Sequence, residues 1–285
     1  AHSTGTQTPA YRGRLVAMPE GHVLHRAARL QGKRFNGHRL AAESPQGRFA
    51  QGAARLDGRV LEGIDAKGKH IFYRFETGDV LHIHLGLYGK FRLDKAPFPE
   101  PSENARLVLS TDSDRIHLAG PTACDLLSET EALAVADRLG PDPILAPSDG
   151  GAQIVERLRR RSIPIGAAIL DQKVIAGLGN VYRAELLYLI GLHPFRRSNT
   201  VEPELIEQLW QLSVKRLKAG ERAGRIVTVD PAEVGAKKQG ELDDDERLYA
   251  YKRDGLPCRR CGDLIHSADI DGRSIWWCPT CQPES

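Results

Sequence analysis

The sequence predicts an α+β protein of several domains: a β-sandwich flanked by helices, then a helical domain, then a small cysteine-bearing unit. Three observations carry this prediction. Short β-branched and aromatic runs fill the region from about 35 to 118, helical spacing prevails after 150, and four of the five cysteines fall in the last stretch of the chain. A chain of 285 residues is long enough for two or more such domains.

The first element is expected to be a helix over residues 20–31. Val23, Ala27 and Leu30 recur at spacings of four and three, which places them on one helical face. Pro19 suits the first position of a helix, because the N–H that it lacks would have no partner there. Gly32 is expected to end this helix.

The next region is expected to form the β-sandwich. The runs RVLEGIDAKGKHIFYRF, DVLHIHLGLYGKFRL and ARLVLSTDSDRIHL are rich in β-branched and aromatic residues and are separated by glycine and aspartate turn signals. Several short strands at this spacing are typical of a sandwich or barrel. His70, His82 and His84 are interpreted as ordinary surface histidines, because no carboxylate spacing beside them indicates a metal.

Helical segments dominate the second half of the chain. RLGPDPILAPSDGG is rich in proline and glycine, and it predicts a linker at 133–150 after an N-terminal domain at 18–132. Helical periods follow in AQIVERLRRR, IPIGAAILDQ, NVYRAELLYLIG and PELIEQLWQLSVKRLKAG, which places a helical domain at 151–248. Its last part, 224–248, is poor in apolar residues and is expected to be a flexible connection to a final unit at 249–285.

Composition narrows the class of protein. Hydrophobic residues make up 41%, and no window approaches the ~18 consecutive apolar residues of a membrane helix, so no membrane partner is expected. The net charge of +3 and the pI of about 8.6 are only mildly basic, so they do not by themselves indicate a nucleic-acid partner. An odd number of cysteines, with Cys124 alone and the rest clustered, favours a reducing compartment and one metal site over a disulfide framework.

The clustered cysteines give the strongest chemical signal. Cys258 and Cys261 form one C-x2-C pair, and Cys278 and Cys281 form another after a spacing typical of a zinc ribbon. Two such pairs can close a tetrahedron around one Zn²⁺, and four thiolates leave no open position, so the predicted ion is structural. A redox dithiol pair is the alternative.

The same unit carries cationic and aromatic side chains that suit phosphate and base contacts. The two tryptophans could instead fill the core of so small a unit. The side chains are Arg259, Arg260, Arg273, Trp276 and Trp277.

A glycine corner stands in GLGNVYRAE. Gly177 and Gly179 flank Leu178, and a helix is expected to begin near Asn180. A helix N-terminus offers unpaired N–H groups to a phosphate, and Gly179 would let the backbone approach closely. The arginine-rich stretch 157–161 adds positive charge upstream. A packing corner and a solvated helix face are the respective alternatives.

The stretch MPEGH holds the parts of an amine catalyst. At a mature N-terminus Pro19 would be a secondary amine that can attack an aldehyde carbon and form an iminium, and Glu20 could transfer protons. The alternative is a helix start in which Pro-Glu serves the first turn and the helix dipole. The residues alone favour this alternative.

Taken in order, Pro-Glu-Gly, a β-rich domain, a Gly-x-Gly-Asn-x-Tyr corner and a four-cysteine ribbon resemble the formamidopyrimidine-DNA glycosylase/endonuclease VIII family of base-excision repair enzymes. GLGNVYRAE and GRSIWWCPTCQ carry the resemblance most specifically, LGPDP and GKH also match, and it extends from Met18 to Gln282. The resemblance implies a helix–two-turns–helix in the helical domain and one structural zinc. It also implies a monomer that acts on damaged DNA in the bacterial cytoplasm, with the nucleoid.

The resemblance further implies roles for single residues. Pro19 would attack C1′ of the damaged nucleotide, and Glu20 would open the sugar ring and help to expel the base. Lys69 on a hairpin, Asn180 in the helix–two-turns–helix and Arg273 at the tip of the zinc finger would contact phosphates. The reaction would be base removal followed by β,δ-elimination at the abasic sugar.

The resemblance also bears on the substrate. Leu87 and Tyr88, between glycines in HLGLYGKF, would be the wedge that fills the space left by a flipped base, a buried turn being the alternative. This pair is more similar to endonuclease VIII than to the purine-specific branch, which has methionine there. Val23 stands where endonuclease VIII often has a second acid, and Ala119 lies near the arginine-bearing loop of the purine branch. Oxidised pyrimidines are the expected substrates, and the purine lesions 8-oxoguanine and formamidopyrimidine are the alternative.

Seventeen residues, 1–17, precede Met18, the only methionine. With them attached, the Pro19 nitrogen would be a tertiary amide that cannot form an iminium. We therefore expect translation to begin at Met18 and the methionine to be removed, so that 1–17 would be a cloning remnant or a misread start. Cleavage after synthesis is one alternative. The other is a native tail, which would give a DNA-binding zinc protein without lyase activity.

Overall fold

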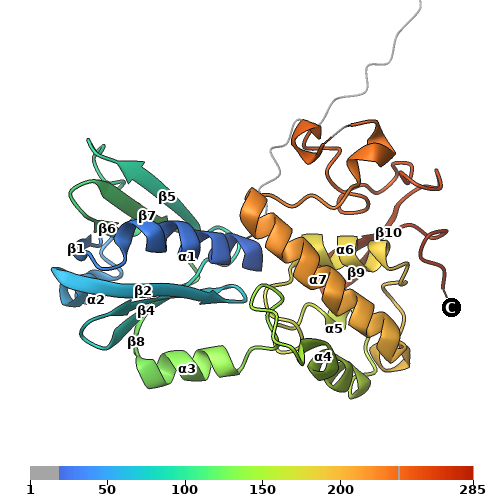
Figure 1. Ribbon diagram of the computed structural model, residues 1–285, viewed down its shortest axis with the longest axis horizontal. Helices are drawn as coiled ribbons and strands as arrows, with labels where there is room; N and C mark the ends of the chain where they lie inside the picture. The colour runs from blue at the N-terminus through green and yellow to red at the C-terminus, as the bar shows by residue number, and fades with distance from the viewer. Residues whose placement is uncertain (1–18, 237, 285) are drawn as a thin grey trace, which may run out of the picture.

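The computed structural model describes residues 19–236 and 238–284, which form a β-rich lobe and a mostly helical lobe side by side (Figure 1). The segment 1–17 and Met18, about which the sequence raised a question, lie outside the described residues. Among the described residues, no helix is long and apolar enough to cross a membrane.

The β-rich lobe is an antiparallel sheet folded upon itself. Its strand order is β5-β7-β6-β1-β2-β3-β4-β8, and β1 pairs with β2 at only two positions, so the two halves of the sheet can turn toward each other there. Apolar side chains of both halves enter one core, which confirms the predicted sandwich. The strands are β1 (Arg39–Glu43), β2 (Arg59–Lys67), β3 (His70–Phe75), β4 (Asp79–His84), β5 (Lys90–Lys95), β6 (Ala105–Ser110), β7 (Asp114–Ala119) and β8 (Ala123–Ser128).

Helix α1 (Gly21–Phe35) closes this core with Leu24, Ala28 and Phe35. The helix runs past Gly32, where the sequence analysis expected it to end, because the fully buried Phe35 draws one more turn into the core. The short α2 (Ala50–Leu56) follows β1.

Helix α3 (Glu129–Asp137) covers the outer face of β3 and β4, so helix occupies the start of the stretch read as a linker at 133–150. Ser128 begins the helix with a capping box formed with Glu131, a local signal for a helix start. On the same sheet His82 is only 6% exposed, so the interpretation of this residue as a surface histidine is wrong. The ring of His82 stacks against those of both Phe72 and His70, with ring centroids 5.2 and 5.1 Å away.

The helical lobe is built around α6 (Asn180–Leu189) and α7 (Pro203–Ala223), with α4 (Gly150–Arg159) and the short α5 (Ile165–Ala168) packed on them. Single 3₁₀ turns occur at Ser198–Thr200, Pro231–Val234 and Gln239–Glu241. Helix α7 meets α1 of the other lobe. Arg26 donates to the carbonyls of Glu221 and Arg222 at 3.0 and 2.6 Å, which satisfies carbonyl groups at the end of α7.

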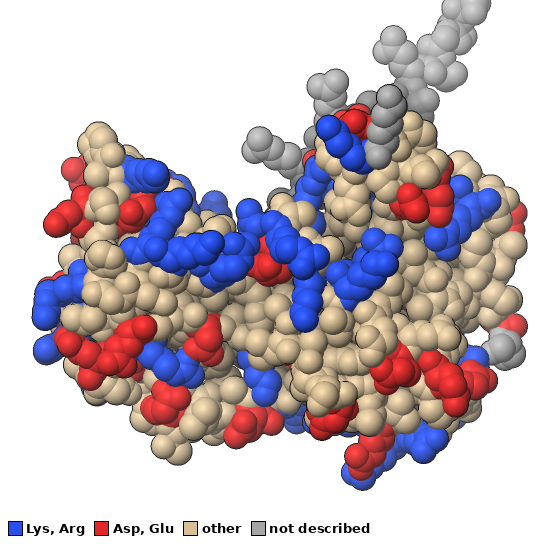
Figure 2. Space-filling view, viewed as in Figure 1, with Lys and Arg blue, Asp and Glu red and all other residues tan. Residues whose placement is uncertain are grey.

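Lysine and arginine side chains form a band over α1 and the neighbouring end of α7 (Figure 2). Arg29 in this region pairs with Glu221, so part of the positive charge serves the contact between the lobes.

The segment 224–248, expected to be a flexible connection, is anchored to the helical lobe. Thr228 and Val229 are fully buried, and the buried Glu185 of α6 accepts hydrogen bonds from the Thr228 hydroxyl and from the backbone N–H groups of residues 249–251. One buried acid therefore fixes both ends of a segment whose own composition indicated little order.

The final unit contains the two-stranded hairpin of β9 (His266–Ile270) and β10 (Arg273–Trp277). Asp271 and Gly272 form its turn, both with positive φ. The unit shares a core with one side of α6, which joins it to the helical lobe.

Candidate active site and zinc ribbon

Three glycines from three distant segments bring the two lobes into contact. A β-carbon on Gly21 would lie 2.8 Å from the Cα of Gly177, and one on Gly68 would lie 3.2 Å from the nitrogen of Gly177. The N–H of Gly21 donates to the carbonyl of Gly177 at 2.8 Å. Because no side chain fits at this glycine junction, Pro19 and Glu20, the β2–β3 hairpin with Lys69 and the glycine corner before α6 lie directly beside one another.

The junction places Glu20 at the N-terminus of α6. Its fully buried carboxylate accepts hydrogen bonds from the N–H groups of Gly179 and Val181, each at 2.8 Å, and of Tyr182 at 3.4 Å. From the sequence, these N–H groups are expected to bind a phosphate. A protein carboxylate occupies them instead, so a phosphate here would have to use side chains.

Most of the predicted site residues line one cleft of about 740 Å³ between the lobes. Pro19, Glu20 and Lys69 form one wall, Asn180 lies on another, and Arg273 enters from the β9–β10 turn. The Oδ1 atom of Asn180 is buried and has no hydrogen-bond partner among the described residues. A polar atom left in this state beside a cleft is available to a ligand.

Burial sets the electrostatics of the amine and acid groups. Burial raises the pKa of Glu20 above its usual value, against the opposing effects of Lys69 and of the N–H groups of α6. Burial likewise lowers the pKa of Lys69; Glu20 opposes this shift and Arg273 adds to it. A carboxyl group with a raised pKa can hold a proton for transfer in a cleft that also contains an amine.

Arg183 fixes the ribbon against α6. It is fully buried, and its guanidinium donates to the carbonyl of Ser274 at 2.6 Å and to the carbonyl of Gly166 at 3.3 Å. Since Ser274 follows Arg273, this contact sets where Arg273 enters the cleft. This arginine lies within GLGNVYRAE, and nothing in the sequence pattern indicates its role.

Leu87 and Tyr88 occupy a tight loop between β4 and β5. Leu87 is 44% exposed and lines the cleft, whereas Tyr88 is 78% exposed and lies outside the cleft lining. The loop is therefore not a buried turn. The β7–β8 turn supports it from behind: a β-carbon on Gly120, next to Ala119, would lie 3.2 Å from the Tyr88 carbonyl.

Several cleft residues were missed by the sequence analysis. His84 was expected to be an ordinary surface histidine, yet it lines the cleft just before the loop that carries Leu87. Gln172 pins the glycine corner, since its amide nitrogen donates to the Leu178 carbonyl and its amide oxygen accepts from the N–H of Gly177, both at 2.9 Å. Tyr251 enters from the segment that Glu185 holds. The only feature of the sequence that could have indicated Tyr251 is its position beside the basic residues Lys252 and Arg253, just before the ribbon. Lys252 also lines the cleft and was missed, whereas Trp276, which lines it too, was among the aromatic side chains that the sequence indicated.

The four cysteines fit one zinc ion. The Sγ atoms of Cys258, Cys261, Cys278 and Cys281 all lie within 4.8 Å of one another, and those of Cys258 and Cys281 are 3.8 Å apart. Zn–S bonds of ~2.3 Å in a tetrahedron require sulfur atoms about 3.8 Å apart. The site is closed by four thiolates, so the zinc is structural, as predicted.

The other ribbon side chains mostly serve packing. Arg259 donates to the carbonyls of Leu248 and Asp245, and Arg260 pairs with Glu233. Trp276 is 8% exposed and donates to Asp254 at 2.9 Å. Trp277 packs edge-on against His193 and Phe195. Arg259 and Arg260 therefore anchor segment 224–248, and the two tryptophans pack within the unit and against the helical lobe.

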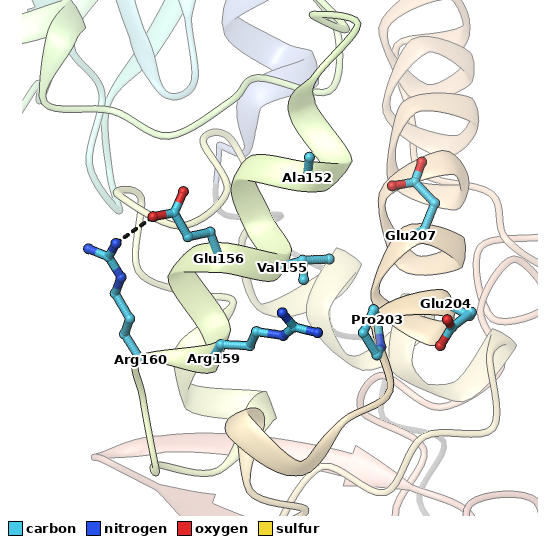
Figure 3. A pocket seen from close by; sticks show the side chains of 8 residues that line it. All are labelled: Ala152, Val155, Glu156, Arg159, Arg160, Pro203, Glu204 and Glu207. Atoms are coloured by element: carbon cyan, nitrogen blue, oxygen red, sulfur yellow. Dashed lines mark hydrogen bonds and ion pairs between the residues drawn. The ribbon is translucent and has the colours of Figure 1, made fainter.

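A second hollow lies between α4 and α7, away from the cleft (Figure 3). Arg160 is tied to Glu156 there, and Glu204 and Glu207 extend from α7. No predicted site residue lines it. Part of the arginine-rich stretch 157–161 thus lies on this solvated surface, as the alternative of a solvated helix face predicts.

Comparison with known proteins covers both lobes. The model of the formamidopyrimidine-DNA glycosylase N-terminal domain matches residues 18–122, and the model of the H2TH domain of the same enzymes matches 139–230. A model described as the zinc finger found in these enzymes and in isoleucyl-tRNA synthetase matches residues 255–283.

Proteins that match this chain over most of its length belong to the same group of enzymes as the domain models. A Mycobacterium tuberculosis protein named endonuclease 8 1 is 43% identical over 273 residues, which are 93% of this chain and 100% of that protein. A formamidopyrimidine-DNA glycosylase of Rhizorhabdus wittichii is 32% identical over 80% of this chain and 84% of its own length. The Lactococcus lactis formamidopyrimidine-DNA glycosylase, solved non-covalently bound to DNA with an abasic site, superposes with a TM-score of 0.78 at 25% identity, over 93% of this chain and 100% of that one.

These comparisons, together with the fold, define a DNA glycosylase that repairs oxidised bases. The chain belongs to the formamidopyrimidine-DNA glycosylase/endonuclease VIII family.

Proposed function

We propose that the protein removes oxidised pyrimidines from DNA and cleaves the resulting abasic site through an iminium formed by Pro19. The convergence of Pro19, Glu20, Lys69, Asn180 and Arg273 on one cleft carries this proposal, because these residues come from four separate segments of the chain. The form that acts would begin at Pro19, since a secondary amine is needed.

In the proposed reaction the Pro19 nitrogen attacks C1′ of the damaged nucleotide. The bond from C1′ to the base breaks, and the base leaves with the proton that the Pro19 nitrogen loses. The buried Glu20 then gives its proton to the ring oxygen as the bond from C1′ to that oxygen breaks. The sugar ring opens to an iminium, which acidifies the C2′ proton. Loss of that proton expels the 3′ phosphate, a second elimination expels the 5′ phosphate, and water releases the amine.

Lys69, Asn180 and Arg273 would hold the phosphates on either side of the lesion. The support is a cationic group on each side of the cleft and the position of Asn180 in its lining, since the side-chain amide of asparagine carries N–H donors for a phosphate. Such contacts fix the register of the strand and carry no sequence information.

Preference for pyrimidine lesions is supported by the exposed pair Leu87–Tyr88 and by Ala119, which lies near the position of the arginine-bearing loop of the purine branch. The relative named endonuclease 8 1 is the more similar of the two relatives above, which points the same way. Action as a monomer on the nucleoid in the bacterial cytoplasm completes the proposal; the relatives named here are bacterial.

Single-turnover assays on Glu20→Gln test the proposed chemistry. Base excision from an oxidised-pyrimidine duplex should fall by ~10²–10⁴ with DNA binding retained, because a positioned acid contributes that much. Wild-type excision by this variant would remove Glu20 from the mechanism. A higher excision rate for 8-oxoguanine than for oxidised pyrimidines would refute the substrate preference alone.

A further inference from the structure

Asp142 is a buried carboxylate that the proposed chemistry does not use. It belongs to the LGPDP segment and is 2% exposed. Its Oδ2 atom accepts from the N–H of Gly68 at 2.6 Å and from Nε2 of His25 at 2.7 Å, and its Oδ1 atom accepts from the N–H of Ile144 at 2.8 Å. One side chain therefore joins the β2–β3 hairpin, helix α1 and the entry to the helical lobe.

The backbone around Asp142 grips the glycine corner at the same place. The N–H of Gly140 donates to the Gln172 carbonyl at 2.8 Å, and the N–H of Ala176 donates to the Pro141 carbonyl at 3.0 Å. The segment 140–142 is thus fixed to the helical lobe by its main chain and to the sandwich lobe by its carboxylate.

Gly68 is the residue directly before Lys69, and it has a φ of +60°. The hydrogen bond from its N–H to Asp142 sets the plane of the peptide at the tip of the hairpin. This is the peptide between Lys67 and Gly68, which directly precedes Lys69 in the lining of the cleft.

We propose that Asp142 is a positioning residue that aims Lys69 at the DNA phosphate, an inference that rests on the phosphate contact proposed for Lys69. Hydrogen bonds and the charge of His25, together with two backbone N–H groups, hold the pKa of Asp142 below its usual value against the effect of burial. The carboxylate is then acceptor-only, which matches three donors.

Replacement by asparagine breaks this arrangement at one atom. An amide has a single oxygen, so Asn at 142 can accept either from Ile144 or from the pair of Gly68 and His25. The other side then faces an N–H₂ group, and the hairpin tip loses its fixed direction with little change in side-chain volume.

The test measures the salt dependence of binding to a duplex with an uncleavable abasic-site analogue, using protein that begins at Pro19. Lys69→Ala should make the slope of log K against log salt shallower by about 0.9, the value for one phosphate contact. Asp142→Asn should produce the same change, and the double variant should show no further change. Excision should fall by up to ~10²-fold in Asp142→Asn, as expected for a misplaced group.

A matched control separates positioning from folding. Asp79 is a buried aspartate of the sandwich lobe, 5% exposed, which accepts hydrogen bonds from Arg55 and Thr77 and does not line the cleft. Asp79→Asn should lower the unfolding temperature and leave the salt slope unchanged. If Asp142→Asn does not fold, His25→Ala removes one partner of the same Oδ2 atom and should still make the slope shallower.

Two results are distinguishable. The positioning role would be overturned if Lys69→Ala makes the slope shallower while Asp142→Asn keeps the wild-type slope. The same holds for His25→Ala where it replaces an Asp142→Asn variant that does not fold. An unchanged slope in Lys69→Ala would instead overturn the phosphate contact on which the inference rests.

Discussion

A single methyl group at Gly21 should disable the enzyme without touching any group proposed to react. A β-carbon at this position would lie 2.8 Å from the Cα of Gly177, 3.1 Å from the carbonyl oxygen of Gly68 and 3.2 Å from that of Gly177. All three atoms belong to backbone, so no flexible side chain can yield. Gly21→Ala must therefore push the start of α1 away from the other two segments.

The displacement follows from contact distances. Carbon atoms approach one another to ~3.5–4.0 Å at best separation, so α1 must withdraw by roughly 0.7 Å or more. Forced overpacking of this kind costs about 1–3 kcal/mol of stability. Pro19 and Glu20 move with the helix start, and a misplacement of ~1 Å reduces rates by up to ~10².

The assay compares Gly21→Ala with Gly32→Ala in the same helix. At Gly32 the nearest atom to a new β-carbon is the side-chain nitrogen of Asn36 at 3.3 Å, on a flexible side chain. Alanine is favoured over glycine inside a helix by up to about 1 kcal/mol, so Gly32→Ala should raise the unfolding temperature and keep full excision. Wild-type stability and excision in Gly21→Ala would show that the glycine junction does not position the cleft.

Four further predictions concern the other parts of the site. Cys258→Ser, or a strong chelator, should release zinc, disorder the ribbon and weaken DNA binding while the sandwich stays folded; full affinity in zinc-free protein, checked by metal analysis, contradicts this. Arg273→Ala should make the salt slope of binding shallower by about 0.9, and an unchanged slope would mean that Arg273 does not grip phosphate. Leu87→Ala with Tyr88→Ala should slow excision from duplex far more than from single strands, because only a duplex has a space to refill; equal losses would rule out a wedge. Because burial raises the pKa of Glu20, its proton-donating form persists to higher pH than in a free glutamate, and excision should decline as pH rises through that pKa; a pH profile without this limb would count against the acid role.

The parts of the site that sequence patterns revealed are those with local signatures. The paired C-x2-C spacing indicated the zinc ligands, and the motifs MPEGH, GKH and GLGNVYRAE each contain one of the three glycines that meet at the junction. What the spacing could not show is that these glycines touch one another, since Gly21 and Gly177 are far apart in the chain and meet only through tertiary packing.

The misplaced expectations have the same origin. The sequence indicated that the N–H groups at the N-terminus of α6 have no protein partner, but Glu20, 159 residues away in the chain, accepts hydrogen bonds from them. Segment 224–248 looked loose because its anchor, Glu185, lies in another element. A buried carboxylate that accepts hydrogen bonds from distant backbone groups produces no periodic pattern in the sequence, so sequence periodicity cannot reveal it.

The most direct test of the mechanism is to locate the amine that forms the iminium. Protein prepared with Pro19 as its first residue is mixed with abasic-site duplex and borohydride, and the adduct is mapped by proteolysis and mass spectrometry. We predict a single adduct on the Pro19 nitrogen and none from protein that retains residues 1–18. An adduct on Lys69, or an equal yield from the extended protein, would contradict the assignment of Pro19 as the nucleophile.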